Sequence, residues 1–371
     1  MKRNLKNILV ALLLVVSALV LTVLIYLAYV IFSYSRIPDR TELEVENQSQ
    51  RILEKNTEYS AVTYNVGFGA YSDEFSFFMD EAEWKDGSHT QGKYGKGISR
   101  EDVIANVEGQ AAILRDILPD FILLQEVDED STRSYHIDMV QYFKDTFPYM
   151  NSTYAINYHS AWLNLPLLDP IGIINSGCVT LSRFFVQYAE RRSYPLATDF
   201  SKFFDLDRCF TVERLPVDGG KTLVLVNSHM SAYDEGGVIR KAQLDMLTSF
   251  MAEEYEKGNW VIVGGDFNHS LGQEFSEAFP SEQVIPEWAK VLDDEDLPDH
   301  FALVKPENGM ETPSCRNADT PYEEGKNYST VLDGFIVSDN VLATATVYDT
   351  GFLYSDHNPV ILNFILKSGK T

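Results

Sequence analysis

The run of apolar residues near the N-terminus constrains the chain more than any other feature of the sequence. Residues 8–32 carry no charged side chain, and the basic residues Lys2, Arg3 and Lys6 precede them. About 20 apolar residues are enough for a helix to cross a bilayer, so this run can span one with some tilt. The run also lacks the polar face that a helix of a soluble domain would expose to water. We therefore predict one transmembrane helix.

A cleaved signal peptide is the alternative interpretation of this run. Its apolar region would usually be only about 7–15 residues long and would end in a small-residue cleavage site, whereas no such site follows residue 32. Basic residues before a span predict an N-terminus inside the cell. We expect a basic cytoplasmic segment at 1–7, a signal anchor at 8–32, a polar stalk at 33–57 and one domain at 58–366, single-pass in the cell membrane and facing outward.

The charge and the cysteines limit the classes of partner. The formal net charge is −25, which argues against a passive electrostatic grip on nucleic acid. A metal enzyme that acts on phosphates is not excluded, because a bound cation reverses the local field. Cys178, Cys209 and Cys315 form no CxxC pair, so we expect free thiols that are mostly buried. The sequence indicates no protein partner.

Strand and helix signals alternate from residue 58 onward. Strands are expected at 59–65 and 121–125, with a helix between them that starts after Ser99 and stops before Pro119. A second helix is expected at 238–255. Later strands are expected at 175–182, 209–216, 222–228, 260–264, 330–337, 344–348 and 358–364, and they often follow one another without a helix between them. This order favours an α/β (α+β) fold of two packed mixed sheets flanked by helices over a simple doubly wound sheet.

Polar side chains of a few kinds end many of these strands. In the stretch NWVIVGGDFNHS, a buried strand leads into Asp266 and Asn268, and we expect Gly264 and Gly265 to let the backbone turn and to leave room for a bound molecule. A single carboxylate at such a place is commonly a turn or cap residue. So many similar endings predict a shared functional rim on a rigid scaffold. They comprise Asn65, Glu126, Asn227, His229, Asp266, Asn268, Asp333, Asp356 and His357.

The order of these endings resembles the endonuclease/exonuclease/phosphatase superfamily, which includes deoxyribonucleases, inositol polyphosphate phosphatases and sphingomyelinases. GDFN at 265–268 and SDHNP at 355–359 are the most specific matches, and NSGCVTLSR at 175–183 resembles a family strand with a departure at CVT. The resemblance covers residues 58–366. It implies a four-layer sandwich and hydrolysis of phosphate esters with Mg²⁺, for which Mn²⁺ is a possible substitute.

The resemblance also implies a metal site. Glu126 matches the metal-binding glutamate of the family, and Asn65 and Asp356 match positions that complete or neighbour the metal shell. Their hard oxygen ligands suit Mg²⁺.

Catalytic roles follow from the same resemblance. Asp266 matches the aspartate that orients or deprotonates the attacking water, and Asn268 is close enough in sequence to reach the same phosphate. His357 matches the histidine that hydrogen-bonds the phosphate, and Asp333 matches its carboxylate partner. His229 matches a second histidine that stabilises charge or protonates the leaving group, although the sequence shows no carboxylate partner for it.

The substrate is less constrained than the chemistry. Arg133, Asn227, Arg316 and Tyr322 are candidate substrate contacts, since arginines near a phosphate site can grip a second phosphate or a head group; ordinary surface pairing is the alternative for the arginines. Residues 67–100 form a long loop that is expected to wall the cleft, and the apolar residues 161–170 either touch lipid or pack into the core.

We expect a membrane-anchored phosphodiesterase that acts on a lipid head group or a small molecule. The alternatives are a nuclease on the outer side of the membrane and a catalytically silent, membrane-tethered binding module.

Overall fold

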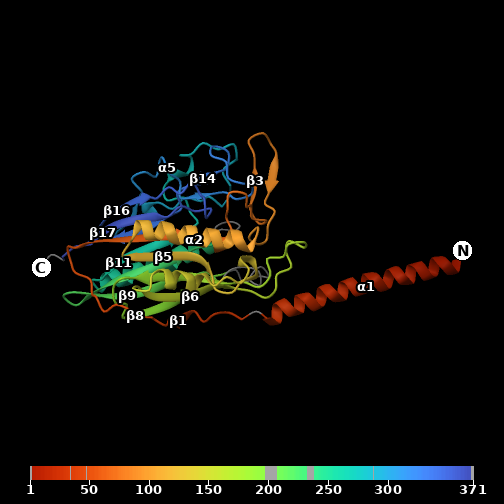
Figure 1. Ribbon diagram of the computed structural model, residues 1–371, viewed down its shortest axis with the longest axis horizontal. Coiled ribbons are helices and arrows are strands. Elements are labelled where there is room, and N and C mark those ends of the chain that lie inside the picture. Colours follow the sequence, from red (N-terminus) through yellow and green to blue (C-terminus); the bar gives the residue numbers. More distant parts are fainter. Residues whose placement is uncertain are drawn as a thin grey trace.

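The computed structural model describes residues 2–33, 35–46, 48–196, 207–231, 238–286 and 288–368, and Figure 1 shows their arrangement. Two large mixed sheets dominate. The seven-stranded sheet has the order β1 (Arg40–Glu42), β8 (Tyr188–Ser193), β9 (Cys209–Val217), β10 (Lys221–His229), β11 (Trp260–Asp266), β15 (Asp333–Ser338), β12 (Phe301–Val304). The six-stranded sheet has the order β16 (Val341–Val347), β17 (Val360–Leu366), β2 (Glu58–Asn65), β5 (Phe121–Asp128), β7 (Asn175–Ser182), β6 (Asn151–His159).

Apolar side chains point alternately to the two faces of each sheet, so that each sheet packs against a layer on both sides. In β10, Leu223 and Leu225 lie in the core between the two sheets, whereas Val224 and Val226 lie in the core on the outer face. The outer face of the seven-stranded sheet packs against α4 (Val238–Glu256), and that of the six-stranded sheet packs against α2 (Arg100–Ile117) and α3 (Met139–Thr146). Helix, sheet, sheet and helix therefore stack as the predicted four-layer sandwich.

Local signals explain where α2 begins and ends. The Ser99 hydroxyl accepts a hydrogen bond from the backbone N–H of Asp102 at 3.1 Å, which satisfies one free amide of the first turn. Leu118 adopts a left-handed conformation with φ of 52° just before Pro119, where the helix ends. The start after Ser99 and the end before Pro119 were predicted from the sequence, whereas the left-handed conformation of Leu118 was not.

Several smaller elements lie outside the two large sheets and the three helices that cover them. They are the hairpin of β3 (Glu81–Glu83) and β4 (His89–Gln91), the pair of β13 (Cys315–Arg316) and β14 (Ser329–Thr330), the short α5 (Gln273–Ser276), and the 3₁₀ turns η1 (Gly67–Gly69), η2 (Thr132–Ser134) and η5 (Asp294–Asp296). The loop at 67–100 packs against the segment around β13, since Phe77 N donates to Ala318 O at 2.9 Å.

Helix α1 (Lys2–Ser33) extends away from the sandwich in Figure 1. Over Arg3–Ser33 it is long and apolar enough to cross a membrane, and its apolar stretch is not buried in the structure; a signal sequence would have the same properties. The segment expected to be a stalk lies largely against the domain. Its strand β1 pairs with β8, with Thr41 opposite Arg191, and Leu53 is buried in the core between the sheets.

Candidate active site

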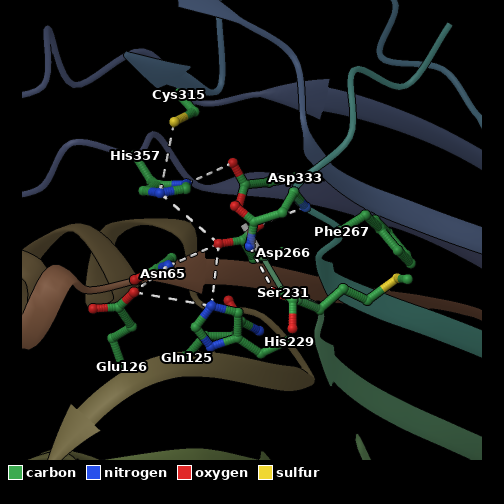
Figure 2. Close-up of polar contacts among 12 residues, drawn as sticks. Asn65, Gln125, Glu126, His229, Ser231, Asp266, Phe267, Cys315, Asp333 and His357 are labelled. Atoms are coloured by element: carbon green, nitrogen blue, oxygen red, sulfur yellow. Dashed lines mark hydrogen bonds and ion pairs between the residues drawn. The ribbon is translucent and has the colours of Figure 1, made fainter. Parts of the chain in front are cut away.

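Strand alternation collects polar side chains on the facing surfaces of the two sheets. Because Leu223 and Leu225 of β10 point into the core between the sheets, Asn227 and His229 follow on the same face. Figure 2 shows how these strand ends converge. By the same alternation, the inner face also carries Asn65 of β2, Gln125 of β5, Asp266 of β11 and Asp333 of β15.

Glu126 also points toward these side chains, but strand alternation does not explain its orientation. Alternation alone would turn it outward with Leu124, but the pairing with β7 shifts between Leu124 and Val127, and Glu126 has a φ of 55°. A bulge with a left-handed residue bends a strand and redirects a side chain. The Glu126 carboxylate consequently lies 3.9 Å from Nε2 of His229 and remains 22% exposed.

Asp266 lies at the centre of the cluster and is buried. Its Oδ2 accepts a hydrogen bond from Nδ2 of Asn65 at 2.9 Å, and its Oδ1 accepts one from the backbone N–H of Asn268 at 2.9 Å. Nε2 of His357 lies 3.9 Å from Oδ2. Burial raises the pKa of Asp266, while the charge of His357 opposes that increase. A buried carboxyl group whose pKa is raised is suited to exchange a proton with a water that binds beside it.

His357 and Asp333 form a buried ion pair. Nδ1 of His357 lies 2.9 Å from Oδ2 of Asp333, which also accepts a hydrogen bond from the Ser314 hydroxyl at 2.8 Å. Burial alone would lower the pKa of His357, but the carboxylates of Asp333 and Asp356 raise it well above its ordinary value. Its Nε2 therefore presents a positively charged donor beside Asp266.

His229 has a different environment. Its Nε2 lies 3.5 Å from Oδ2 of Asp266, and its Nδ1 lies 3.2 Å from Nδ2 of Asn157 in β6. Burial, together with the charges of Arg208, His357 and Arg133, lowers the pKa of His229 well below its ordinary value. The partner beside Nδ1 is an amide and not a carboxylate, so this ring is held neutral while that of His357 is held charged.

Glu126 and Asp356 fit a divalent cation. Burial raises the pKa of Asp356 to about 6 although His357 opposes it, and the charge of Glu126 raises it further. A cation that neutralises both carboxylates would remove this penalty, and hard oxygen ligands match Mg²⁺. Asn65 lies beside them, with Nδ2 3.4 Å from Oε1 of Glu126 and Oδ1 accepting from the N–H of Gly67 at 3.0 Å.

A second group of metal-capable side chains overlaps the first. Asp266, Asp333 and His357 each offer a ligand atom within 4.8 Å of the others. A histidine must be neutral to bind a metal, however, and the ion pair with Asp333 favours the protonated ring of His357. The chemistry of the donors therefore favours Glu126 and Asp356 as the place for a hard cation.

Two of the predicted substrate contacts bond mainly to the protein. Arg133 forms a double hydrogen bond with the buried Asp128, at 3.1 and 2.9 Å, and its guanidinium stacks 3.8 Å from the ring centre of Phe68. Asn227 is fully buried, and its Oδ1 accepts from Nε2 of Gln125 at 2.7 Å across the two sheets. Both side chains therefore support the site through bonds to other protein groups, Arg133 to Asp128 and Asn227 to Gln125.

Arg316 and Tyr322 remain in a position suited to a substrate. Arg316 lies 5.5 Å from the ring centre of Tyr322, and its charge lowers the pKa of the neighbouring Asp356 against the larger effect of burial. Its Nε and Nη2 are buried without a hydrogen-bond partner within the described part of the chain. Such unsatisfied donors are expected where an anion binds.

Arg208 is a residue that the sequence analysis missed. It is buried, and its charge lowers the pKa of both His229 and Asp266, in each case as a smaller effect than burial. Within the described residues, its Nε and Nη1 have no hydrogen-bond partner. Arg208 immediately precedes β9, a position that carries no distinctive motif.

The loop after β11 differs in part from its expected role. Asn268 donates from Nδ2 to the carbonyl of Met230 at 2.8 Å. A side chain at Gly264 would collide with Phe335 and Leu123, and one at Gly265 would lie 1.9 Å from the carbonyl oxygen of Ser228. The two glycines therefore allow close packing of the sheets and strands. Our expectation that they leave room for a substrate was wrong, because protein atoms occupy that space.

The fold and this cluster define a class of enzyme. Carboxylates suited to a hard cation lie beside a buried aspartate and a charged histidine, at the rim of a four-layer sandwich. This set of groups serves the hydrolysis of phosphate esters, which needs a cation, a positioned water and donors for the developing charge.

Comparison with known proteins agrees with that class. Residues 62–357 match the Endonuclease/Exonuclease/phosphatase family. The chain belongs to this family, and it is a metal-dependent hydrolase of phosphoric esters. A comparison with curated protein sequences gives no match.

Solved structures share the fold at low sequence identity. An endonuclease/exonuclease/phosphatase from Beutenbergia cavernae has 15% identity and a TM-score of 0.54, with coverage of 84% of this chain and 72% of that one. A family protein from Leptotrichia buccalis has 12% identity and a TM-score of 0.53, covering 82% and 99%. TDP2 from Caenorhabditis elegans has 16% identity and a TM-score of 0.51, covering 84% and 76%. At these identities the likeness concerns the fold alone.

Proposed function

We propose that the chain is a membrane-anchored, Mg²⁺-dependent phosphodiesterase whose domain faces away from the cytoplasm and acts on a lipid head group or a small molecule. The observation that carries the proposal is the arrangement around Asp266. This buried aspartate lies 3.9 Å from a histidine that Asp333 keeps charged, next to carboxylates suited to a cation.

Each side chain takes a separate task in this proposal. Asp266 orients the attacking water and accepts its proton, because burial raises its pKa. His357 donates a hydrogen bond to the phosphate, and Asp333 keeps its ring oriented and charged. His229 is neutral and donates to a phosphate oxygen or to the leaving group. Asn268 fixes Asp266 through its backbone N–H.

The proposed cation is held by Glu126 and Asp356, with Asn65 beside them. It would withdraw charge from a phosphate oxygen. Arg316, Tyr322 and Arg208 contribute contacts to a substrate anion, since both arginines keep buried, unpartnered nitrogens. Arg133 and Asn227 support the site from behind through Asp128 and Gln125.

The net charge of −25 favours a small or lipid-borne substrate over a long polyanion. The test is a panel assay of the full chain in detergent with Mg²⁺ and bis-p-nitrophenyl phosphate, sphingomyelin, inositol phosphates, DNA and RNA. We expect hydrolysis of diesters that excess EDTA abolishes. Activity that persists in EDTA would refute the metal mechanism, and a preference for nucleic acid would favour a nuclease.

The proposed topology has its own test. The uncleaved helix α1 should keep the protein in membranes after carbonate washing, and Lys2, Arg3 and Lys6 before it predict an outward domain. Protease added to intact cells without an outer wall should digest the domain. Recovery of a soluble protein that begins after residue 32 would show instead that the segment is a cleaved signal.

A further inference from the structure

The loop between β6 and β7 carries a patch of exposed apolar side chains. We call residues 161–173 the apolar loop. Leu167 is 74% exposed and Leu168 is 100% exposed. Trp162, Leu165 and Ile173 are exposed as well. A cluster of large apolar side chains in water marks a surface that another phase or partner covers. The sequence left open whether this loop touches lipid or packs into the core, and the structure divides it: Leu167 and Leu168 are exposed, whereas Leu163 and Ile171 are buried in a small apolar cluster.

The apolar loop lies against the outer end of α1. The Tyr26 hydroxyl donates to the carbonyl of Trp162 at 3.1 Å, and the same hydroxyl accepts from the N–H of Asn164 at 3.2 Å. The Tyr29 hydroxyl accepts from the N–H of Trp162 at 3.2 Å. In Figure 1 the corresponding yellow-green loop lies near the end of the red helix that is closer to the sandwich, which is its C-terminal end. Tyr26 and Tyr29 come one to two turns before the end of α1 at Ser33, where tyrosines commonly mark the membrane interface.

The backbone of the apolar loop is also suited to a lipid interface. Leu163 and Gly172 exchange backbone hydrogen bonds at 3.0 and 3.1 Å, and Ile171 N donates to Leu165 O at 2.8 Å. Unpaired backbone groups oppose entry into an apolar phase. Here the internal pairs and the two tyrosines satisfy many of them.

The base of the apolar loop is fixed to the candidate active site. Thr132 N donates to the carbonyl of Ile173 at 2.8 Å, and Ile173 N donates to the Thr132 hydroxyl at 3.2 Å. Thr132 belongs to η2, shortly after the bulge at Glu126. The apolar loop is therefore linked through η2 to the end of β5, where Glu126 lies.

We propose that the apolar loop inserts into the outer leaflet of the bilayer that α1 spans, and so holds the rim near Glu126 at the lipid surface. The occupant of the exposed patch is lipid, because the loop is hydrogen-bonded to the outer end of the apolar helix. The inference rests on one part of the proposed function, namely that α1 anchors the protein in a membrane. It adds that the site faces substrates that lie in, or emerge from, the same membrane.

The test measures lipid contact without relying on catalysis. Cys178, Cys209 and Cys315 are buried, so a cysteine introduced as Leu168→Cys can be labelled selectively with an environment-sensitive fluorophore. The full chain is reconstituted into vesicles of phosphatidylcholine and phosphatidylglycerol that contain a spin-labelled quencher lipid. Leu342→Cys provides the control, because Leu342 is 56% exposed and belongs to β16, at the end of the domain remote from α1 in Figure 1.

We expect lipid quenching at position 168 to be several-fold stronger than at position 342. Adding Leu167→Asp to the labelled Leu168→Cys protein should remove most of that difference, with hydrolysis of soluble bis-p-nitrophenyl phosphate unchanged. Equal quenching at both positions would overturn the proposal. Cleavage of α1 from the protein, followed by release of the domain from the vesicles, would overturn it as well. If quenching is strong but no variant hydrolyses any phosphate ester, the lipid contact stands and the proposed function fails.

Discussion

The Asp333→Asn substitution separates the charge of a buried carboxylate from its shape. Oδ2 of Asp333 accepts hydrogen bonds from Nδ1 of His357 at 2.9 Å and from the Ser314 hydroxyl at 2.8 Å. An asparagine oxygen can keep both contacts but carries no charge. Without that charge, burial dominates the environment of His357 and its pKa falls, so a smaller fraction of the ring is charged when the phosphate binds.

The magnitude follows from the contact that is weakened. A hydrogen bond to a charged group contributes about 1.5–3 kcal/mol, and each 1.36 kcal/mol corresponds to roughly a tenfold change in rate. We therefore expect kcat to fall roughly 10- to 150-fold, with KM changed much less because the charge matters most in the transition state. His357→Ala removes the donor itself and should lower kcat about 10²–10⁴-fold.

The assay compares kcat and KM on bis-p-nitrophenyl phosphate at saturating Mg²⁺, with the melting temperature as a fold control. The combined Asp333→Asn, His357→Ala protein should be scarcely slower than His357→Ala, because residues that act as a unit give non-additive losses. Asp339→Asn is the matched control, since Asp339 pairs with His300 at 2.8 Å on the exposed surface, and its kcat should stay unchanged. Fully additive losses for Asp333 and His357 would refute the pairing.

The remaining predictions concern the reacting centre, the cation and a buried acid. Asp266→Asn should keep the fold and lower kcat about 10²–10⁴-fold; a folded variant with normal kcat would exclude Asp266 as the base. Glu126→Gln should raise the Mg²⁺ concentration needed for half-maximal activity and lower the rate severely, which a metal titration measures. Burial raises the pKa of Glu213 to about 7 against hydrogen bonds from Thr153 and Thr211. Since the unfolded chain releases this proton near the ordinary pKa of about 4.3–4.5, the contribution of Glu213 to stability is most favourable below that pH, declines as pH rises from there to about 7, and is least favourable above 7. Glu213→Gln should remove a penalty on the order of 3 kcal/mol at pH 8, and urea unfolding at pH 5 and pH 8 would contradict this if the pH dependence of the two proteins were the same.

Much of the fold could be predicted because its signals are local. The strand predicted at 175–182 is β7 as observed, and the helix predicted after Ser99 ends before Pro119. The three cysteines are free and buried as expected. Strands β6 and β8 and helix α3 were not predicted. Polar residues interrupt the apolar pattern of β6 and β8, for example Asn157 and Arg191, whose partners come from distant parts of the chain.

The candidate site could be predicted from the sequence wherever a residue lies at either end of a strand and follows the ordinary alternation. Asp266 and Asp333 point inward for that reason, and their register in β11 and β15 places them opposite each other. Glu126 needs a bulge and a left-handed backbone, which no pattern of apolar residues reveals. Asn157 and Arg208 act through contacts between strands that are far apart in sequence. Their importance depends on tertiary packing and not on a local motif.

The pairing of β1 with the sheet limits how far the domain can move from the end of α1. Only residues 34–39 separate the end of α1 at Ser33 from β1 at Arg40, and six residues span about 22 Å at most, at roughly 3.3–3.6 Å each. If α1 spans a membrane as proposed, a domain joined to it by so short a segment can reach only a thin layer above the bilayer. If its substrate is lipid-borne, turnover follows the number of substrate molecules per area of bilayer. Inert lipid mixed into the membrane then slows the reaction, whereas dilution of the whole suspension leaves the rate per enzyme unchanged.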